Sequence, residues 1–212
     1  MTNSIGVAYF QDGKLKIAQD PTRDRERVIQ ALSAPTGSKP ANPFGALTDL
    51  MNGWDWGSAR RAVLLISNGF EPAGTETHEN SFAEAVIETA QRAGVLVYAV
   101  YHPSADYATS DYSKLYSGQV ELAHVAYETG GEAFFLGFGP LPSLAPFLAD
   151  IAEHLANQYM VEFLANPGEK PGLCVITVKC NDRNIELMAP GRVWIPGPGG
   201  TDEKAKAAPG KQ

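Results

Sequence analysis

The chain has 212 residues, of which 44% are hydrophobic and 19% are charged, and its formal net charge is -7. Its length suggests one domain with at most a small appendage, and its apolar fraction is high enough for a packed core. The acidic balance excludes a general nucleic-acid binder, which needs a basic face, and no apolar run approaches the ~20 residues that cross a bilayer. The start, MTNSIGVAYF, lacks the basic and apolar regions of a signal peptide, so the chain as written is expected to stay in the cytoplasm.

Two strands joined by a tight turn are predicted at the N-terminus. Residues 4–11 and 15–19 read as strands and flank Asp12-Gly13, a dipeptide that is typical of β-hairpin turns. The following PTRDRERVIQAL predicts a short helix with Thr22 as its N-cap. The expected apolar edge of that helix consists of Val28, Ile29 and Leu32.

Strands and helices alternate after a Pro- and Gly-rich loop at 33–43. FGALTDLMNGW predicts a helix ending at Gly53, and the continuous apolar run at 62–66 predicts a strand buried on both faces in the middle of a parallel sheet. Further helices are expected at 81–93, at 119–129 and after Ser143, alternating with strands at 95–101 and 132–136. This pattern predicts an α/β fold: an open, mostly parallel, Rossmann-like sheet with helices on both faces.

The C-terminal part has a different pattern. Residues 158–164, 173–180 and 185–188 predict strands joined by turns, which indicates an antiparallel extension. From Gly197 the sequence has no periodicity and is typical of a disordered tail. The predicted organisation is therefore an α/β domain at 4–157, a strand extension at 158–196 packed on the same domain, and a tail at 197–212.

Three loops at the carboxyl ends of the predicted strands are the places where ligands gather in such folds. The first contains Ser67, Asn68 and Gly69, which either contact a ligand or form a turn with positive φ. The second is polar and aromatic, which suits protein recognition, although its rings could instead pack onto the domain itself. Its residues are Asp106, Tyr107, Asp111, Tyr112 and Tyr116.

Catalytic and phosphate-binding patterns are weak in this sequence. The third loop, GFGPLP, lacks the GxGxxG ending and the lysine of a P-loop, and its prolines remove amide donors. The four histidines lie far apart and show no HExxH spacing. Ser67 and His102 both lie at strand ends and could serve a small hydrolase, but no G-x-S-x-G elbow frames the serine.

Four segments in order resemble the bacterial VWFA-related family, a branch of the von Willebrand factor A (VWA) domains. They are RRAVLLISNGFEP, QRAGVLVYAVYHP, ETGGEAFFLGF and LANQYMVEFLANPGEKPGLCVITVKC. The resemblance implies an α/β sheet with a metal-ion-dependent adhesion site. In that site a DxSxS motif, a threonine and an aspartate hold Mg²⁺, and the ion binds a carboxylate of a partner protein.

The chain departs from that family pattern at each part of the metal site. No DxSxS occurs, Asn68-Gly69 replaces the family's Asp-Gly, and Thr48 lies within a predicted helix. We therefore expect no metal ligands and no cofactor. The resemblance also implies that a central strand is missing between residues 5–10 and 62–66. The alternatives are a truncated N-terminus, which we favour, direct pairing of the two neighbours, or a strand supplied by a partner.

The sequence predicts a non-enzymatic protein-interaction module, VWA-like, with a degenerate or absent ion site and an unidentified protein partner. The alternatives are a Ser67–His102 hydrolase and a nonfunctional remnant. The family resemblance implies export if the N-terminus is truncated. The expected contact surface consists of Ser67, Asn68, Gly69, Glu71, Asp106, Tyr107, Asp111, Tyr112, Tyr116 and Phe138.

Overall fold

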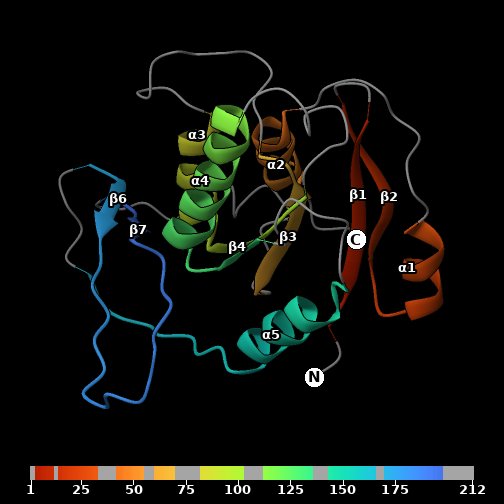
Figure 1. Ribbon diagram of the computed structural model, residues 1–212. Helices are drawn as coiled ribbons and strands as arrows, with labels where there is room; N and C mark the ends of the chain where they lie inside the picture. Colours follow the sequence, from red (N-terminus) through yellow and green to blue (C-terminus); the bar gives the residue numbers. More distant parts are fainter. Residues whose placement is uncertain are drawn as a thin grey trace, which may run out of the picture.

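The structure is a computed structural model, which describes residues 3–11, 14–32, 42–54, 60–69, 82–102, 112–135, 143–165 and 170–197. Within these ranges the helices are α1 (Arg25–Ala31), α2 (Pro43–Asn52), α3 (Phe82–Ala93), α4 (Tyr112–Thr129) and α5 (Ala145–Ala156). The strands are β1 (Ile5–Gln11), β2 (Lys14–Thr22), β3 (Arg61–Ser67), β4 (Val95–Tyr101), β5 (Ala133–Phe135), β6 (Gly172–Val175) and β7 (Arg192–Ile195). They form one parallel sheet and two antiparallel pairs, so the fold is α/β in class (Figure 1).

The parallel sheet has the strand order β3-β4-β5. β3 pairs with β4 along its whole length, from Arg61 opposite Val95 to Ser67 opposite Tyr101. β4 is the middle strand and is buried on both faces. The prediction that residues 62–66 form the middle strand is therefore wrong for the described sheet. β3 is paired on one side only, and its side chains alternate between half-buried and exposed.

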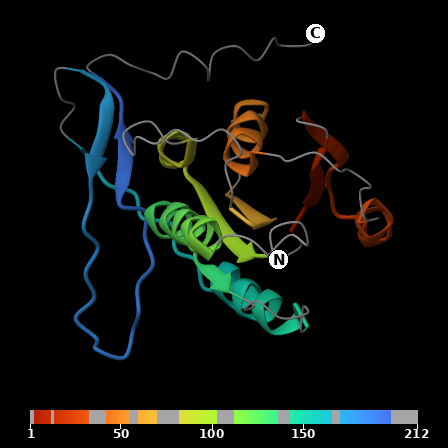
Figure 2. The same ribbon diagram turned by 45° about the horizontal axis from the view of Figure 1, so that its top comes forward.

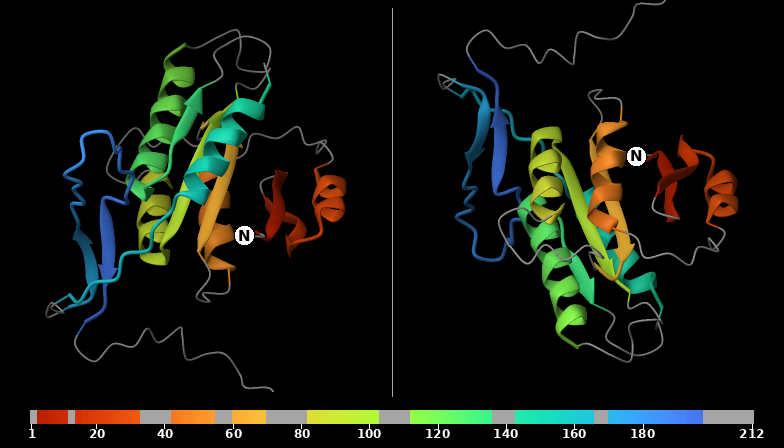
Figure 3. Two further views of the ribbon diagram at one scale, coloured as in Figure 1. Left: turned by 90° about the horizontal axis from the view of Figure 1, so that it is seen from below. Right: turned by 90° about the horizontal axis from the view of Figure 1, so that it is seen from above.

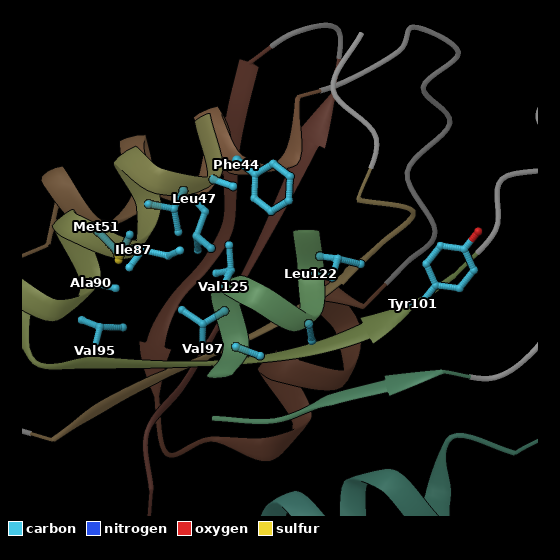
Figure 4. Close-up of a cluster of buried hydrophobic side chains, with 14 residues drawn as sticks. Phe44, Leu47, Met51, Ile87, Ala90, Val95, Val97, Tyr101, Leu122 and Val125 are labelled. Atoms are coloured by element: carbon cyan, nitrogen blue, oxygen red, sulfur yellow. The ribbon is translucent and has the colours of Figure 1, made fainter. Parts of the chain in front are cut away.

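Helices cover both faces of the parallel sheet, and each face has its own core. On one face, α2, α3 and α4 pack against alternate residues of β4 (Figure 4). The buried aliphatic and aromatic side chains there include Phe44, Leu47, Met51, Ile87, Val97 and Val125. On the other face, α5 packs against the remaining residues of β4 and against β5 (Figure 3). That smaller core contains Tyr98, Val100, Phe134 and Ile151.

The predicted N-terminal hairpin is confirmed. β1 and β2 pair antiparallel, from Ile5 opposite Thr22 to Gln11 opposite Lys14, with register irregularities near Val7. This pair forms a sheet of its own, and no described hydrogen bond joins it to the parallel sheet. Direct pairing of β1 with β3, one of the alternatives for the missing strand, is thus not observed among the described residues.

The helix after the hairpin differs from its prediction in its cap and its apolar edge. The N-cap is Asp24, whose Oδ1 accepts from the backbone N–H groups of Glu26 and Arg27 at 3.0 and 3.3 Å. Thr22, the predicted cap, is the last residue of β2. Val28 is buried, but Ile29 is 68% exposed, so the predicted apolar edge is wrong beyond its first residue. A helix of seven residues that packs on the hairpin has little surface to bury.

The ends of the middle helices follow their local sequence signals. Asn42 caps α2 by accepting from the N–H groups of Phe44 and Gly45 at 3.0 and 3.1 Å, and Gly53 follows its last turn as predicted. α4 ends at the predicted Gly130, which has φ 82°. Its start was predicted at residue 119, but the helix begins at Tyr112, so part of the predicted loop is helical. Asp and Ser near this start resemble loop composition but are equally typical of helix N-termini.

The helix α5 begins close to its predicted start. Ser143 Oγ accepts a hydrogen bond from the Ala145 N–H at 3.1 Å. Ile151 is buried, whereas Leu148, three residues earlier on the same helix, is exposed. The adjacent Phe147 packs there instead, with its ring centroid 5.4 Å from that of Phe134.

The C-terminal extension is antiparallel but has less strand than predicted. β6 pairs with β7, and the Ile176 N–H donates to Gly191 O at 3.1 Å. Residues 158–164 and 185–188 form no strands, so those two predictions are wrong, and β7 was not predicted. The base of the extension contacts α3 and α4 (Figure 2): the Arg92 guanidinium lies 4.2 Å from the Trp194 ring centroid, and the Gly191 N–H donates to Glu128 O at 3.1 Å.

Candidate functional site

The carboxyl ends of β3 and β4 lie side by side and carry the first group of predicted site residues. Ser67 and Tyr101 are paired in the sheet, and the His102 N–H donates to Ser67 O at 2.8 Å. Ser67 and Asn68 are half-buried at this edge. The parallel register therefore brings Ser67 and His102 together, as their positions at strand ends predicted.

The loop after β3 is a turn that packs tightly on α4. Gly69 has φ 66° and is buried, and the Ser67 Oγ accepts a hydrogen bond from its N–H at 3.2 Å. A Cβ atom on Gly69 would collide with the carbonyl oxygen of Gly118, and one on Gly118 would collide with Asn68 O. Of the two interpretations of this segment, the turn with positive φ is confirmed at Gly69. Contact of Ser67 or Asn68 with a ligand stays a prediction.

Tyr101 places a buried hydroxyl at the same edge. Its side chain is fully buried, and its hydroxyl makes no hydrogen bond of full geometry. Figure 4 shows its oxygen pointing away from the larger core. Burial raises the pKa of this hydroxyl above the ordinary 10.0, and the nearby Gln119 side chain offsets part of the rise. A buried polar atom with incomplete hydrogen bonding costs free energy, so among the described residues this hydroxyl adds little to stability.

Replacing Tyr101 with phenylalanine removes this hydroxyl, and we expect the free energy of unfolding at pH 7 to stay the same or rise by up to about 1 kcal/mol. Because the folded pKa is raised, the wild-type chain loses stability as the pH rises above 10.0, and Tyr101→Phe should lose less. Urea unfolding at pH 7 and pH 10.5 measures both effects. Tyr127→Phe, at an exposed position, is the control. An unchanged alkaline loss in Tyr101→Phe would contradict this account.

The described contacts between Ser67, His102 and Gly69 all involve backbone groups. The contact between Ser67 and His102 is a backbone hydrogen bond, and the serine oxygen is engaged by the Gly69 N–H. A serine nucleophile also donates its own proton to an imidazole nitrogen, and that arrangement at Ser67 and His102 stays a prediction. In the part of the chain that the structure describes, no three or more His, Cys, Asp or Glu side chains are placed to hold a metal ion.

The other predicted site residues are only partly placed. Tyr112 is the first residue of α4, and Tyr116 lies one turn later with 70% of its surface exposed. An exposed Tyr116 does not pack onto the domain as the alternative interpretation of that loop required. The remaining members fall outside the described residues, and their role stays a prediction. They are Glu71, Asp106, Tyr107, Asp111 and Phe138.

The C-terminal extension carries an exposed apolar surface that the sequence analysis missed. Large apolar side chains are exposed along both 159–164 and 175–188, while the base of the extension is held on α3 and α4. We call these residues the extension surface: Tyr159, Met160, Val161, Phe163, Leu164, Val175, Val178, Ile185, Leu187 and Met188. The alternation of apolar residues was the available signal, but it was interpreted as strand pairing and not as exposure.

Two contacts of Glu84 lie beside the base of the extension. Glu84 on α3 has one carboxylate oxygen 3.2 Å from His124 Nε2 and the other 4.0 Å from an Arg192 nitrogen. These contacts tie α3 to α4 and to β7. They fix where the extension leaves the α/β core, but they are half-exposed and contribute little stability each.

None of the described helices combines the length and the apolar character needed to cross a membrane. No model of a known protein family matches the chain, and no curated protein matches it significantly. Among solved structures, the chain is similar to an uncharacterised membrane spanning protein from Vibrio fischeri, with 17% sequence identity and a TM-score of 0.25. That match covers 72% of this chain and 74% of the other.

Proposed function

We propose that this chain is a non-enzymatic protein-interaction module and that the extension surface is its main contact region. The observation that supports the proposal is the run of exposed apolar side chains at 159–164 and 175–188. Large exposed apolar surfaces are typical of protein-interaction sites. Tyr159 and Phe163 are the kinds of side chain that supply most of the binding energy in interfaces.

The arrangement of the extension supports binding as well. Its base is anchored by the Arg92–Trp194 contact and by the Gly191–Glu128 hydrogen bond, which hold β7 on α3 and α4. A surface held in position before binding loses less conformational entropy when a partner binds. Tyr116 on α4 and the predicted residues of the neighbouring loops would add polar contacts to the same module.

The expected result of changing this surface is loss of partner capture. The immobilised full chain should retain a specific protein from a lysate of the source organism. The double variant Phe163→Ser/Leu164→Ser should retain at least about tenfold less of it, because both side chains are exposed and would be buried in the complex. Quantitative mass spectrometry of the retained proteins measures the difference.

The matched control is Ile29→Ser/Leu32→Ser, which removes two exposed apolar side chains at α1, distant in sequence from the extension. Equal loss in both double variants would indicate nonspecific adsorption and would contradict the proposal. Retention of no specific protein by the wild-type chain would favour the nonfunctional remnant.

We further propose that the module is VWA-like with a degenerate ion site. The support is the parallel sheet with helices on both faces and the tight turn Ser67-Asn68-Gly69 at its carboxyl edge. An amide at Asn68 brings no negative charge to a cation, unlike the aspartate of the family pattern.

Isothermal titration of the full chain with Mg²⁺ should therefore show no binding at micromolar concentrations. Restoring the carboxylate with Asn68→Asp alone should not create binding. Clear micromolar binding by the wild-type chain would contradict the degenerate site.

A further inference from the structure

The β6–β7 pair is attached to the α/β core without sharing its hydrophobic interior. We call residues 170–197, which contain this pair, the β6–β7 arm. Figure 1 shows β6 and β7 beside α3 and α4, with the rest of the arm extending away from them. Both hydrophobic cores are built without any described residue of the arm, and no side chain described in the arm is fully buried. The apolar burial that makes unfolding cooperative is therefore missing between the arm and the core.

The side-chain contacts that hold the arm on α3 are partly exposed to water. The Arg92 guanidinium lies 4.2 Å from the Trp194 ring centroid, and Arg92 itself is exposed. An Arg192 nitrogen lies 4.0 Å from a Glu84 carboxylate oxygen, and these two side chains are 35% and 46% exposed. A cation on an exposed aromatic ring and a half-exposed ion pair are both weak, because water competes for the charged groups.

The backbone hydrogen bond between the arm and α4 can also break at low cost. Glu128 O accepts from the Gly191 N–H at 3.1 Å and from Gln91 Nε2 at 2.7 Å. If the arm leaves, this oxygen keeps the hydrogen bond from Gln91, and the Gly191 N–H is free to bind water. Undocking then leaves neither group without a partner, so it avoids the main penalty for breaking a hydrogen bond.

The docked position is nevertheless specific, because two glycines allow close contact with the end of α4. A Cβ atom on Gly130 would lie 2.7 Å from Pro190 N. A Cβ atom on Gly191 would lie 2.6 Å from Glu128 Oε2. The turn before β7 thus fits against the end of α4 with no room for a side chain at either glycine. The arm has a defined docked position that is held by weak contacts.

We propose that the β6–β7 arm docks reversibly on α3 and α4 and opens as a unit while the α/β core stays folded. Opening breaks the contacts of Trp194, Arg192 and Gly191 with the two helices together. The arm carries half of the extension surface, at 175–188, so opening changes where that half lies relative to the core. A partner that binds only the docked arm shifts this equilibrium toward docking. The equilibrium belongs to the chain alone, so it can be tested without the partner of the proposed function.

Hydrogen exchange of the full chain, followed by nuclear magnetic resonance in urea concentrations below the unfolding transition, tests the proposal. The Gly191 N–H should be protected by docking but should exchange at least about hundredfold faster than the buried amides of β4, which need global unfolding. Its exchange should also depend less on urea, because opening of the arm exposes less surface than global unfolding.

A core variant separates opening of the arm from global unfolding. Ile151→Val weakens the smaller core and should speed exchange of β4 by about threefold or more. It should leave exchange of Gly191 within about twofold, because undocking breaks no contact of Ile151. The comparison of Gly191 with β4 in the unchanged chain needs no variant.

A second pair of variants tests the contact between Arg92 and Trp194. Arg92→Ala should speed exchange of Gly191 by about two- to fivefold, because it removes the cation from the ring. Arg25→Ala, which removes the same charge from an exposed position on α1, should leave it unchanged. In a chain that already carries Trp194→Leu, Arg92→Ala should have little further effect, since the two side chains act through one contact.

Four outcomes would overturn the proposal. Equal protection of Gly191 and β4, or equal acceleration of both by Ile151→Val, would show that the arm opens only when the whole chain unfolds. An unprotected Gly191 N–H would show that the arm is not docked. Equal effects of Arg92→Ala and Arg25→Ala would show that the contact with Trp194 does not hold the arm.

Discussion

Gly69→Ala is expected to lower the free energy of unfolding by about 3 kcal/mol, because two costs add at this position. The residue has φ 66°, a backbone conformation that an L side chain adopts with strain. Its added Cβ would also lie 2.8 Å from Leu122 Cγ and would collide with the Gly118 carbonyl oxygen. The carbonyl belongs to the backbone of α4, so it cannot move without displacing the helix. Urea unfolding followed by circular dichroism measures the loss.

Gly94→Ala is the matched control for this change. Gly94 has nearly the same φ, 63°, but a Cβ there would meet nothing within 4 Å. Only the backbone strain remains, and we expect a loss of about 1 kcal/mol. The difference between the two variants therefore reports the packing of the turn 67–69 on α4. Equal losses would show that this turn does not pack on α4 as described.

Phe44→Ala is expected to cost about 3–5 kcal/mol, which is a large part of the stability of a small domain. Phe44 lies in the first turn of α2 and is completely buried in the larger core, where it contributes a full aromatic ring (Figure 4). Truncation removes its buried area and leaves a cavity between α2 and the sheet. The midpoint of urea unfolding should fall accordingly.

Phe163→Ala serves as the control, since Phe163 is more than half exposed on the extension. It should change the free energy of unfolding by less than about 0.5 kcal/mol. If Phe44→Ala gives too little folded protein to measure, Phe44→Leu keeps most of the volume and should cost about 1 kcal/mol. A loss of less than about 1 kcal/mol in Phe44→Ala would contradict the described core.

Short sequence signals correctly predicted the features that depend on neighbouring residues in the chain, such as turns and helix ends. Asp12-Gly13 joins two strands that do pair in the register a two-residue turn gives. Gly53 and Gly130 follow the last turns of α2 and α4, because a glycine ends a helix at no steric cost. The class of the fold follows from this alternation of strands and helices.

Features set by neighbours in space were not predictable in the same way. The run 62–66 is as apolar as a middle strand, yet β3 is an edge strand of the described sheet, because apolar composition does not reveal how many strands lie beside it. Residues 158–164 alternate like a strand but form no strand in the described structure. Their alternation predicted a sheet, and the structure shows an exposed apolar surface instead.

The sequence predicted Ser67 at the carboxyl end of a strand, but not the contacts around it. The pairing of Ser67 with Tyr101 at the sheet edge follows from the parallel register. The buried hydroxyl of Tyr101 and the collision that excludes a side chain at Gly118 depend on how α4 lies against the turn. Residue spacing in the sequence does not show how closely α4 lies against the turn 67–69. These features could therefore be found only in the structure.

Hydrogen exchange of the full chain, alone and with the purified protein that it captures, is the most direct test of the proposed interaction module. We predict slower exchange at 158–165 and 175–188, where the exposed apolar side chains would become buried. Exchange in β4 should stay unchanged, because that strand is already buried on both faces. Unchanged exchange in both extension segments, with the partner bound, would contradict the central claim.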